Sequence, residues 1–336
     1  MMAINSSHVS TRKLKISFFI FCSVIFAFLL TLMPNEYFRD RANYIIYAKE
    51  SLNIIERYDG VALFTNEPLF LLLNNVLSFF FDAEIVPLIF VSFIGFTVSY
   101  FLFIRSKNVL LTALGFMALI LVPQSFHMLL VVLRQAFTAT LLMWFIYYFW
   151  HSRYFLFLVF LLGFIHSSGF IVFAFLSIDK VFSSLISKSI LLRVVFFIFI
   201  SAVVSFLIIP LAEVLLLRQA TEYQDAVSGG GGGNFIIYMS VLLVTLSQRK
   251  KMHTDDGFYV VALVGVSVYV GMYFFSPFAG RLITSFLPLI ICLMCMFGNA
   301  RSYLLLAGFV LINSLIFKSA IEYNSLSELG VRYLLG

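Results

Sequence analysis

Long uninterrupted runs of apolar residues dominate the chain, separated by short polar stretches. Seven runs are long enough to cross about 30 Å of hydrocarbon as helices; they cover residues 16–33, 85–104, 109–133, 154–178, 194–212, 257–280 and 282–300. Four shorter runs cover residues 69–81, 135–150, 235–248 and 302–317. A membrane β-barrel would show alternating strands instead of continuous runs. The pattern predicts an all-α, polytopic transmembrane bundle of about 9–11 membrane segments.

Composition supports lipid as the solvent of most of the surface. Of the 336 residues, 62% are hydrophobic and 11% charged, against about 25% charged in soluble domains. No soluble fold of this length hides so much apolar surface. We therefore expect a single integral membrane domain over residues 1–336. The net charge of +6 lies in short loops, where it reports orientation rather than nucleic-acid binding.

The first apolar run predicts an uncleaved helix. Arg12, Lys13 and Lys15 precede it, but no small-residue cleavage site follows Met33, as a signal peptide would require. The cysteines also lie within apolar runs. Cys292 and Cys295 form a C-x-x-C without acidic or histidine neighbours, which favours packing residues over a metal or redox pair.

Six basic clusters predict which loops face the cytoplasm; they lie at residues 12–15, 105–107, 151–153, 180–193, 249–251 and 301. An even number of crossings must then separate each pair. Three runs lie between the first two clusters, and a single run of 25 residues lies between 153 and 180. Either one or two clusters violate the rule, or two segments are not plain spans.

The two irregular segments each contain polar residues. Run 69–81 is short and holds Asn74 and Asn75, which suits a re-entrant or tilted half-helix. Run 154–178 has His166-Ser-Ser-Gly169 at its centre and suits a hairpin of two short helices. Broken helices at membrane depth are tolerated where they line an enclosed or watery cavity. We therefore predict a functional cavity.

This orientation leaves four stretches outside the membrane: an external loop at residues 34–66, a turn at 123–127, a Gly-rich loop at 213–234 and a turn at 276–280. Residues 40–58 predict an amphipathic helix lying on the membrane. Five glycines at 229–233 favour a lid or spacer over a phosphate loop, because the strand–loop–helix setting and the lysine of a phosphate loop are missing.

Four ionisable residues at the predicted outer ends of apolar runs require an explanation, since charges are costly in lipid. Arg134, Arg281, Glu67 and His166 all fall on the same predicted side. Structural explanations without a functional role remain open for three of them. Arg134 could snorkel to the outer surface or pair with Glu67 or Glu213, Arg281 could be an interfacial arginine at a helix end, and His166 could be a core histidine bonded to Ser167 or Ser168. Together they are typical of a polar site.

The residue types in this group suit a lipid diphosphate. A guanidinium stays charged and binds phosphate with two parallel hydrogen bonds, so Arg134 and Arg281 can neutralise a diphosphate without metal. The external loops lack D-x-D and H-x-x-x-H patterns, so we expect no metal site. His166, Asp40 and Glu67 are the candidates to deprotonate an attacking hydroxyl.

The order of these motifs resembles the EpsG family of Wzy-like polysaccharide polymerases. The similarity spans about residues 35–290. Its most specific part is Arg134-Gln135 followed by Phe164-Ile165-His166-Ser167; the remaining parts are Arg39-Asp40 to Tyr47, Asn66 to Phe70, and Gly280-Arg281. The five-glycine run is a departure from the family pattern.

The resemblance implies a metal-independent, GT-C-like glycosyltransferase that needs no cofactor and works at the periplasmic face of the bacterial inner membrane. Its partners would be undecaprenyl-diphosphate-linked glycans and membrane lipid, with no nucleic acid; a chain-length regulator protein stays an open possibility. By position, Arg134 and Arg281 would bind the diphosphate, His166 would orient or deprotonate the acceptor, and Asp40 and Glu67 would bind sugar or share the base role. Further candidates for substrate binding are Gln135, Tyr44, Arg218 and Tyr223.

Three other functions remain open at this point. An O-antigen ligase has similar chemistry but usually a larger external loop than 213–234. A flippase or transporter for the lipid-linked unit would favour an internal repeat and polar residues in both leaflets. A membrane O-acyltransferase would use His166 as base with its donor on the cytoplasmic side.

Overall fold

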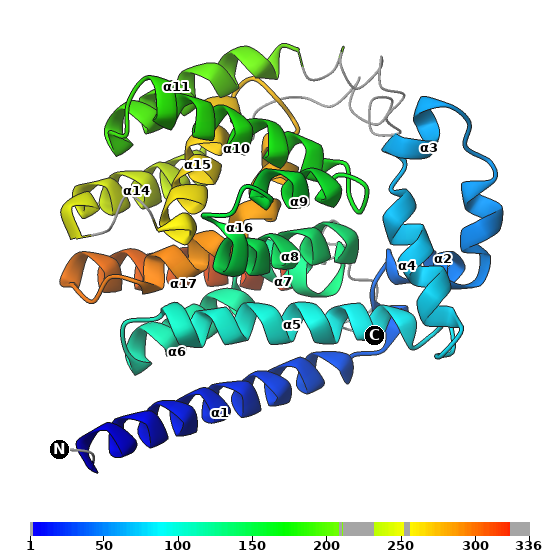
Figure 1. Cartoon of the computed structure of the whole chain (residues 1–336), viewed down its shortest axis with the longest axis horizontal. Helices are drawn as coiled ribbons and strands as arrows, with labels where there is room; N and C mark the ends of the chain where they lie inside the picture. The colour runs from blue at the N-terminus through cyan, green and yellow to red at the C-terminus, as the bar shows by residue number, and fades with distance from the viewer. Residues whose placement is uncertain (1–2, 208–209, 211–231, 252–255, 323–336) are drawn as a thin grey trace.

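The structure, a computed structural model, describes residues 3–207, 210, 232–251 and 256–322, with side chains from residue 14 onward. These residues form α-helices and two short 3₁₀ turns, and no strand occurs among them (Figure 1). The helices are α1 (Ala3–Thr31), α2 (Arg41–Ile55), α3 (Val61–Thr65), α4 (Pro68–Ser78), α5 (Val86–Arg105), α6 (Val109–Leu121), α7 (Pro123–Leu130), α8 (Leu133–Phe149), α9 (Phe155–Leu162), α10 (Ser168–Leu185), α11 (Ile190–Ser205), α14 (Gly233–Ser247), α15 (Gly257–Met272), α16 (Ala279–Cys295) and α17 (Ala300–Glu322).

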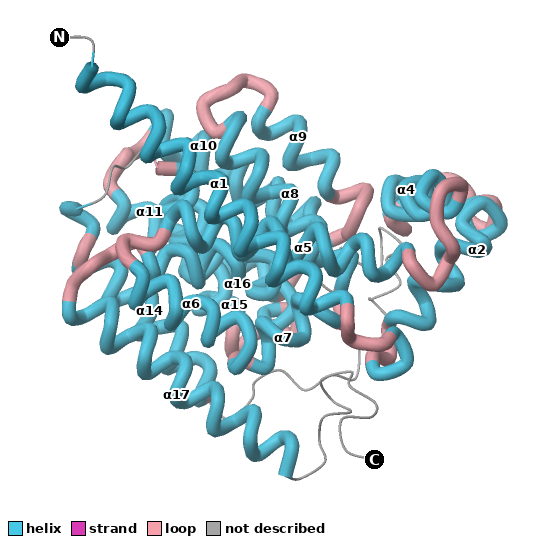
Figure 2. Tube along the Cα trace, turned by 90° about the horizontal axis from the view of Figure 1, so that it is seen from below, coloured by secondary structure: helices cyan, strands magenta, loops and turns pink. Residues whose placement is uncertain are grey.

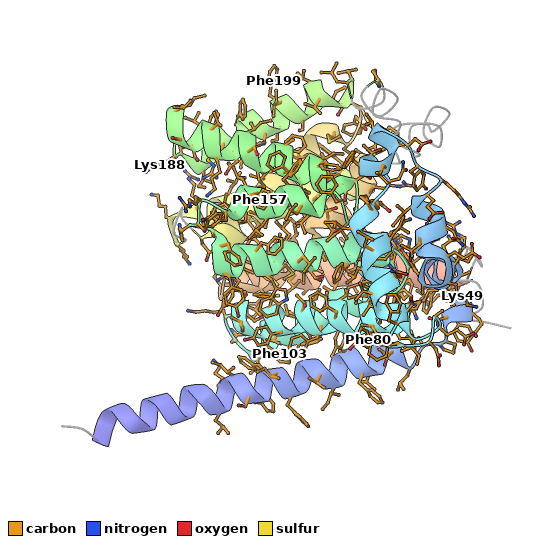
Figure 3. The ribbon with its side chains drawn as sticks, turned by 45° about the vertical axis from the view of Figure 1, so that its right-hand side comes forward. Lys49, Phe80, Phe103, Phe157, Lys188 and Phe199 are labelled. Carbon is orange, nitrogen blue, oxygen red and sulfur yellow. The ribbon has the colours of Figure 1, made fainter. Side chains whose placement is uncertain are left out.

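Several of these helices meet the requirements of a membrane span. By length and composition α1, α5, α10 and α17 are long and apolar enough, and α6 with α7 makes a fifth candidate that is bent by 74°. Five shorter apolar helices accompany them. Large apolar side chains such as Phe80, Phe157 and Phe199 point outward (Figure 3). The predicted polytopic helical membrane fold is confirmed.

The core of the bundle is formed by α15 and α16. Every residue of α15 is buried, and a Cβ added to Gly265 would lie 2.3 Å from the ring of Phe286 on α16. The two helices therefore approach more closely than larger side chains would allow. In Figure 2 the other helices surround this central pair.

The basic clusters gather at one end of the bundle. Arg105 pairs with Asp256, next to Gly257 and Trp150. Lys180 lies 3.8 Å from the Trp150 ring centroid, and Arg193 pairs with Asp179, the residue before Lys180. Arg301 lies at the same end, where it donates a hydrogen bond to Ser247. Lys15 also lies there, over the ring of Phe19. The positive-inside rule predicted that these clusters would share one side of the bundle.

The hairpin predicted within residues 154–178 is present. Helix α9 leaves the basic end and stops at Leu162, and α10 returns to bring Lys180 back over Trp150. The break falls at His166 and Ser167, as the polar residues predicted. A Cβ on Gly169 would lie 2.5 Å from the Leu162 carbonyl carbon, so the corner requires a glycine.

The second irregular segment is the short helix α4. Its 11 residues extend only about 16 Å, which is too short to span. It packs with α2 at the end of the bundle opposite the basic clusters, on the right-hand side of Figure 1. Helix α2 confirms the helix predicted within residues 40–58; its position on a membrane surface stays a prediction.

One local expectation is wrong. Residues 123–127 do not form an external turn but the start of α7, whose Pro123, Ser125 and Phe126 are buried. Proline at the first position of a helix needs no N–H partner and favours a new helix. The chain therefore bends at Val122 and continues as a short helix inside the bundle. Most of the predicted loop at 213–234 lies outside the described residues.

Candidate functional site

A cavity of about 680 Å³ opens at the end of the bundle that carries α2 and α4. Its lining comes from helices far apart in sequence, and many of its side chains are polar or aromatic. The cavity brings together seven residues singled out from the sequence: Asp40, Tyr44, Glu67, Arg134, Gln135, His166 and Arg281. Arg218 and Tyr223 lie outside the described residues.

Glu67 lies at the centre of the charged part of the cavity. Its carboxylate is buried and pairs with the Arg134 guanidinium, while its Oε1 lies 3.1 Å from His166 Nδ1. The backbone of Glu67 is left-handed, with φ of 64°, and it is the only described non-glycine residue with positive φ. Such a conformation costs energy and is found preferentially at functional sites.

The neighbouring backbone explains how Glu67 reaches His166. Pro68 begins α4 directly after Glu67, and the Leu69 N–H donates to the Phe164 carbonyl at 3.0 Å. This hydrogen bond joins the first turn of α4 to the corner between α9 and α10. Both irregular segments therefore meet at the site, and each contributes one member of the Glu67–His166 pair.

The contact with Glu67 favours one tautomer of His166. Nδ1 lies 3.1 Å from the carboxylate oxygen but 3.4 Å from the Ser168 nitrogen. A hydrogen on Nδ1 would face the closer and more basic carboxylate. Nε2 then keeps its lone pair, and His166 lines the cavity. The arrangement suits proton acceptance at Nε2.

Glu67 itself is a poor proton acceptor. It precedes α4 and lies outside the membrane-spanning segments. Burial opposes its ionisation, but the Arg134 guanidinium and His166 outweigh that cost and lower the pKa of Glu67 to about 2. The side chain is therefore a fixed carboxylate whose chemistry is to orient its two partners.

Arg134 lies in the first turn of α8, beside two aromatic rings. Its guanidinium carbon lies 5.3 Å from the ring centroid of Tyr47 and 5.9 Å from that of Tyr44, distances at which the rings attract a cation. The side chain still exposes 31% of its surface. Glu67 and the rings fix its position, and donors remain accessible from the cavity for an anionic ligand.

Gln135 connects α8 to α16 and the histidine corner. Its Nε2 donates to the Arg281 carbonyl and, at 2.8 Å, to Ser285 Oγ. Ser285 Oγ in turn lies 3.2 Å from Ser168 Oγ. The amide of Gln135 therefore positions the first turn of α16, from which Arg281 lines the cavity.

Asp40 lies at the rim, on the residue before α2. Its carboxylate is 3.6 Å from Arg39 Nε, and both residues line the cavity. Arg41 anchors the same helix from its other side, since its buried guanidinium donates to the Leu130 carbonyl and to Asn35 Oδ1 at 3.1 Å each. Helix α2 is thereby held against α7 beside the site.

Sequence reasoning missed several neutral and weakly basic residues of the cavity. Gln124 and His127 were assigned to a turn, and Tyr238, Tyr269 and Asn313 received no role, yet all five line the cavity. The polar residues of 123–127 were the available signal for the first two. Single tyrosines and asparagines in apolar runs give no comparable signal.

The described residues contain no group of three or more histidine, cysteine or acidic side chains arranged to hold a metal ion. Cys292 and Cys295 are free thiols buried in α16, away from the residues that line the cavity.

A family model matches most of the chain. The model of the EpsG family matches residues 15–329. No curated protein and no solved structure matches the chain, so the GT-C-like architecture implied by the resemblance stays a prediction.

Proposed function

Because the chain belongs to the EpsG family of polysaccharide polymerases, we propose that it joins undecaprenyl-diphosphate-linked repeat units into a polymer at the periplasmic face of the inner membrane. The proposal rests on one arrangement above all. Glu67 holds Arg134 and His166 together inside a cavity that Arg39 and Arg281 also line. The arrangement combines a proton acceptor with guanidiniums suited to a diphosphate.

The chemistry is a glycosyl transfer between two lipid-linked glycans. A hydroxyl of the incoming unit attacks the anomeric carbon of the sugar joined to the diphosphate of the growing chain. A new glycosidic C–O bond forms, and the C–O bond to the diphosphate breaks. The hydroxyl proton passes to His166 Nε2, and the lipid diphosphate leaves with the bonding electron pair.

Each charged residue has a distinct role in this reaction. Arg134 and Arg281 stabilise the negative charge that grows on the leaving diphosphate. Glu67 keeps His166 in the tautomer that accepts a proton and keeps Arg134 in place. Gln135 positions the turn that holds Arg281. Asp40 binds sugar hydroxyls at the rim, and the buried Tyr44 does so from inside the cavity.

The placement of the basic clusters supports the proposed periplasmic location. The basic clusters lie at the end of the bundle opposite the cavity, and positive loops face the cytoplasm in most membrane proteins. The cavity then opens on the other side, where lipid-linked units are polymerised.

Deletion of the gene tests the function against its rivals. Loss of the polymer ladder, with single repeat units still transferred to the cell surface, supports the polymerase. Polymer left on undecaprenyl diphosphate indicates a ligase, absence of any surface unit indicates a flippase, and an unchanged ladder refutes all three.

Complementation with single variants then tests the site. We expect His166→Ala and Arg134→Ala to abolish polymer while the protein still accumulates in the membrane. General base catalysis contributes roughly 10²- to 10⁴-fold to a rate, so the loss should be visible on a gel. Normal chain length in both variants would refute the proposed roles.

A further inference from the structure

The cavity has a second wall, opposite in character to the charged residues around Glu67. We call it the neutral wall; it consists of Asn234, Tyr238, Tyr269, Asn313 and Ile316. These residues come from α14, α15 and α17, and none of the described residues that these helices contribute to the lining is charged. The charged residues come instead from the segment before α2, the start of α4, α8, the α9–α10 corner and α16.

The rings of the neutral wall form a continuous packed surface. The Tyr238 and Tyr269 ring centroids are 4.7 Å apart, and Tyr238 lies 6.1 Å from Phe309. Asn313 follows one turn after Phe309 and donates one amide hydrogen to its carbonyl at 2.8 Å. The wall is therefore rigid and largely preformed, as binding sites for small ligands usually are.

Gln124 connects the neutral wall to the turn that contains Arg281. Its Oε1 accepts from the Tyr238 hydroxyl at 2.9 Å, and its Nε2 donates to the Gly280 carbonyl at 3.0 Å and to Thr284 Oγ1 at 3.2 Å. Both the oxygen and the nitrogen of the Gln124 amide are thus hydrogen-bonded. Tyr238 is held in one orientation next to the residues proposed to bind the diphosphate.

Two polar groups of the wall remain available to a ligand. The Tyr269 hydroxyl makes no hydrogen bond to any described residue, and the Asn313 carbonyl oxygen likewise accepts none. Neither atom is among the fully buried polar atoms that lack a partner, so both are accessible from the cavity that their residues line. Each offers a neutral hydrogen bond to a ligand.

The chemistry of the wall selects a hydroxyl-rich neutral ligand. An anionic group would need a cation, and the described residues of this wall provide none. A polyprenyl chain would need a continuous apolar lining, whereas Ile316 is the one aliphatic residue here. Sugar hydroxyls both donate and accept, and burying them costs little when neutral partners satisfy them.

We propose that the neutral wall is a subsite for uncharged sugar residues of the lipid-linked glycan, with the Tyr269 hydroxyl and the Asn313 carbonyl as its hydrogen-bonding groups. The inference rests on the proposed function, because it assigns two parts of the same lipid-linked substrate to two different walls of the cavity. The charged wall binds the diphosphate, and the neutral wall binds sugars attached to it or approaching it.

Binding measurements on the full-length protein in lipid nanodiscs test the subsite. One probe is undecaprenyl diphosphate without sugar; the others are the lipid-linked repeat unit and the lipid-linked polymer isolated from suitable strains. The variants are Tyr269→Phe, which keeps the ring packing, and Asn313→Ala. The matched control is Tyr259→Phe, since Tyr259 is on the same helix, has a buried hydroxyl without a partner and does not line the cavity.

We expect each variant to weaken binding of a glycan-bearing probe roughly 3- to 10-fold, the usual effect of one lost neutral hydrogen bond. Binding of undecaprenyl diphosphate should not change, and the control should bind all probes normally. A loss restricted to the polymer or to the single unit assigns the subsite to the growing or the incoming glycan. Either result supports it.

Three results contradict the proposal in different ways. Unchanged binding of both glycan-bearing probes in both variants refutes the subsite. Equal loss for sugar-free undecaprenyl diphosphate means that the wall binds the lipid or diphosphate instead. If the wild-type protein binds none of the probes, the proposed function itself fails.

Discussion

Glu67 Oε1 lies 3.1 Å from His166 Nδ1, and the same carboxylate pairs with Arg134. One buried anion thus contacts both His166 and Arg134, and the three residues come from three separate parts of the chain. Its left-handed backbone directs the carboxylate into the cavity immediately before the proline that begins α4. Loss of this one charge should therefore affect both partners together.

Replacement of Glu67 by glutamine should abolish polymer formation, with a rate loss of at least roughly 10²-fold. Arg134 would lose its counter-ion, and His166 would no longer be held with its hydrogen on Nδ1. In-vitro polymerisation by the purified protein measures the loss. Asp256→Asn is the control, because it breaks an arginine–carboxylate pair at the opposite end of the bundle. Equal losses in the two variants would mean that Glu67 acts only through stability.

The low pKa of Glu67 predicts how stability depends on pH. Burial opposes ionisation of this carboxyl, but Arg134 and His166 lower its pKa from 4.5 to about 2. A carboxyl with a lowered pKa stabilises the fold above its unfolded pKa, and this stabilisation is lost as pH falls toward the folded value. The difference in thermal stability between wild type and Glu67→Gln should therefore shrink progressively as pH falls below about 4.5. Unfolding followed in detergent from pH 6 down to about 3 measures the difference, and a difference that does not shrink below pH 4.5 would contradict the assignment.

Arg134→Lys tests whether planar bidentate contact is needed rather than charge alone. A lysine keeps the positive charge but loses the fork that matches phosphate oxygens and the flat face over Tyr47 and Tyr44. We expect at least a tenfold fall in kcat/KM, roughly the value of one lost charge-assisted hydrogen bond. Lys180→Arg at the basic end serves as a control for exchange of cations. Full activity of Arg134→Lys would show that a point charge suffices.

The hairpin was predictable from sequence because its signal is local. Four polar or small residues interrupt a run of 25 apolar positions at His166, and lipid tolerates such a break only beside a cavity. The positive-inside rule likewise predicted that the basic clusters share one end, and the parity of crossings then pointed to the two irregular segments. Helix α7 was not predictable in the same way, since Pro123 is compatible with both a turn and the first residue of a helix.

Partner choice within the site was only partly predictable from sequence: pairing of Arg134 with Glu67 was one of several alternatives, and the structure selects it, whereas the contact between Glu67 and His166 was not predicted. The sequence predicted that Glu67, Arg134 and His166 lie on one side, but their pairing depends on how α4 packs against the α9–α10 corner. The neutral wall escaped notice for a different reason. Neutral polar side chains cost little free energy in an apolar helix, so Tyr238, Tyr269 and Asn313 do not mark a site in the sequence. Only the packing of their helices shows that they line one cavity.

Gly169 should be required for the corner that presents His166. A Cβ there would lie 2.5 Å from the Leu162 carbonyl carbon and 2.6 Å from the Gly163 nitrogen, and backbone atoms cannot move aside without opening the hairpin. We expect Gly169→Ala to destabilise the protein by about 2–4 kcal/mol and to reduce its accumulation in the membrane. Gly308→Ala is the matched control, because nothing lies within 4 Å of its added Cβ on α17. Normal accumulation and activity of Gly169→Ala would show that the corner is more plastic than its contacts indicate.

The two ends of the bundle should face opposite sides of the membrane. Lys49 on α2 and Lys188 before α11 are exposed at opposite ends of the molecule (Figure 3). Single cysteines at these positions, in a variant whose three native cysteines are replaced, can be labelled with a membrane-impermeant maleimide. The positive-inside rule predicts that Lys49→Cys reacts in cells whose inner membrane is intact. Lys188→Cys should react only after that membrane is permeabilised, because it lies among the basic clusters. The reverse pattern would place the cavity on the cytoplasmic side, where the lipid-linked units would have to be polymerised before export.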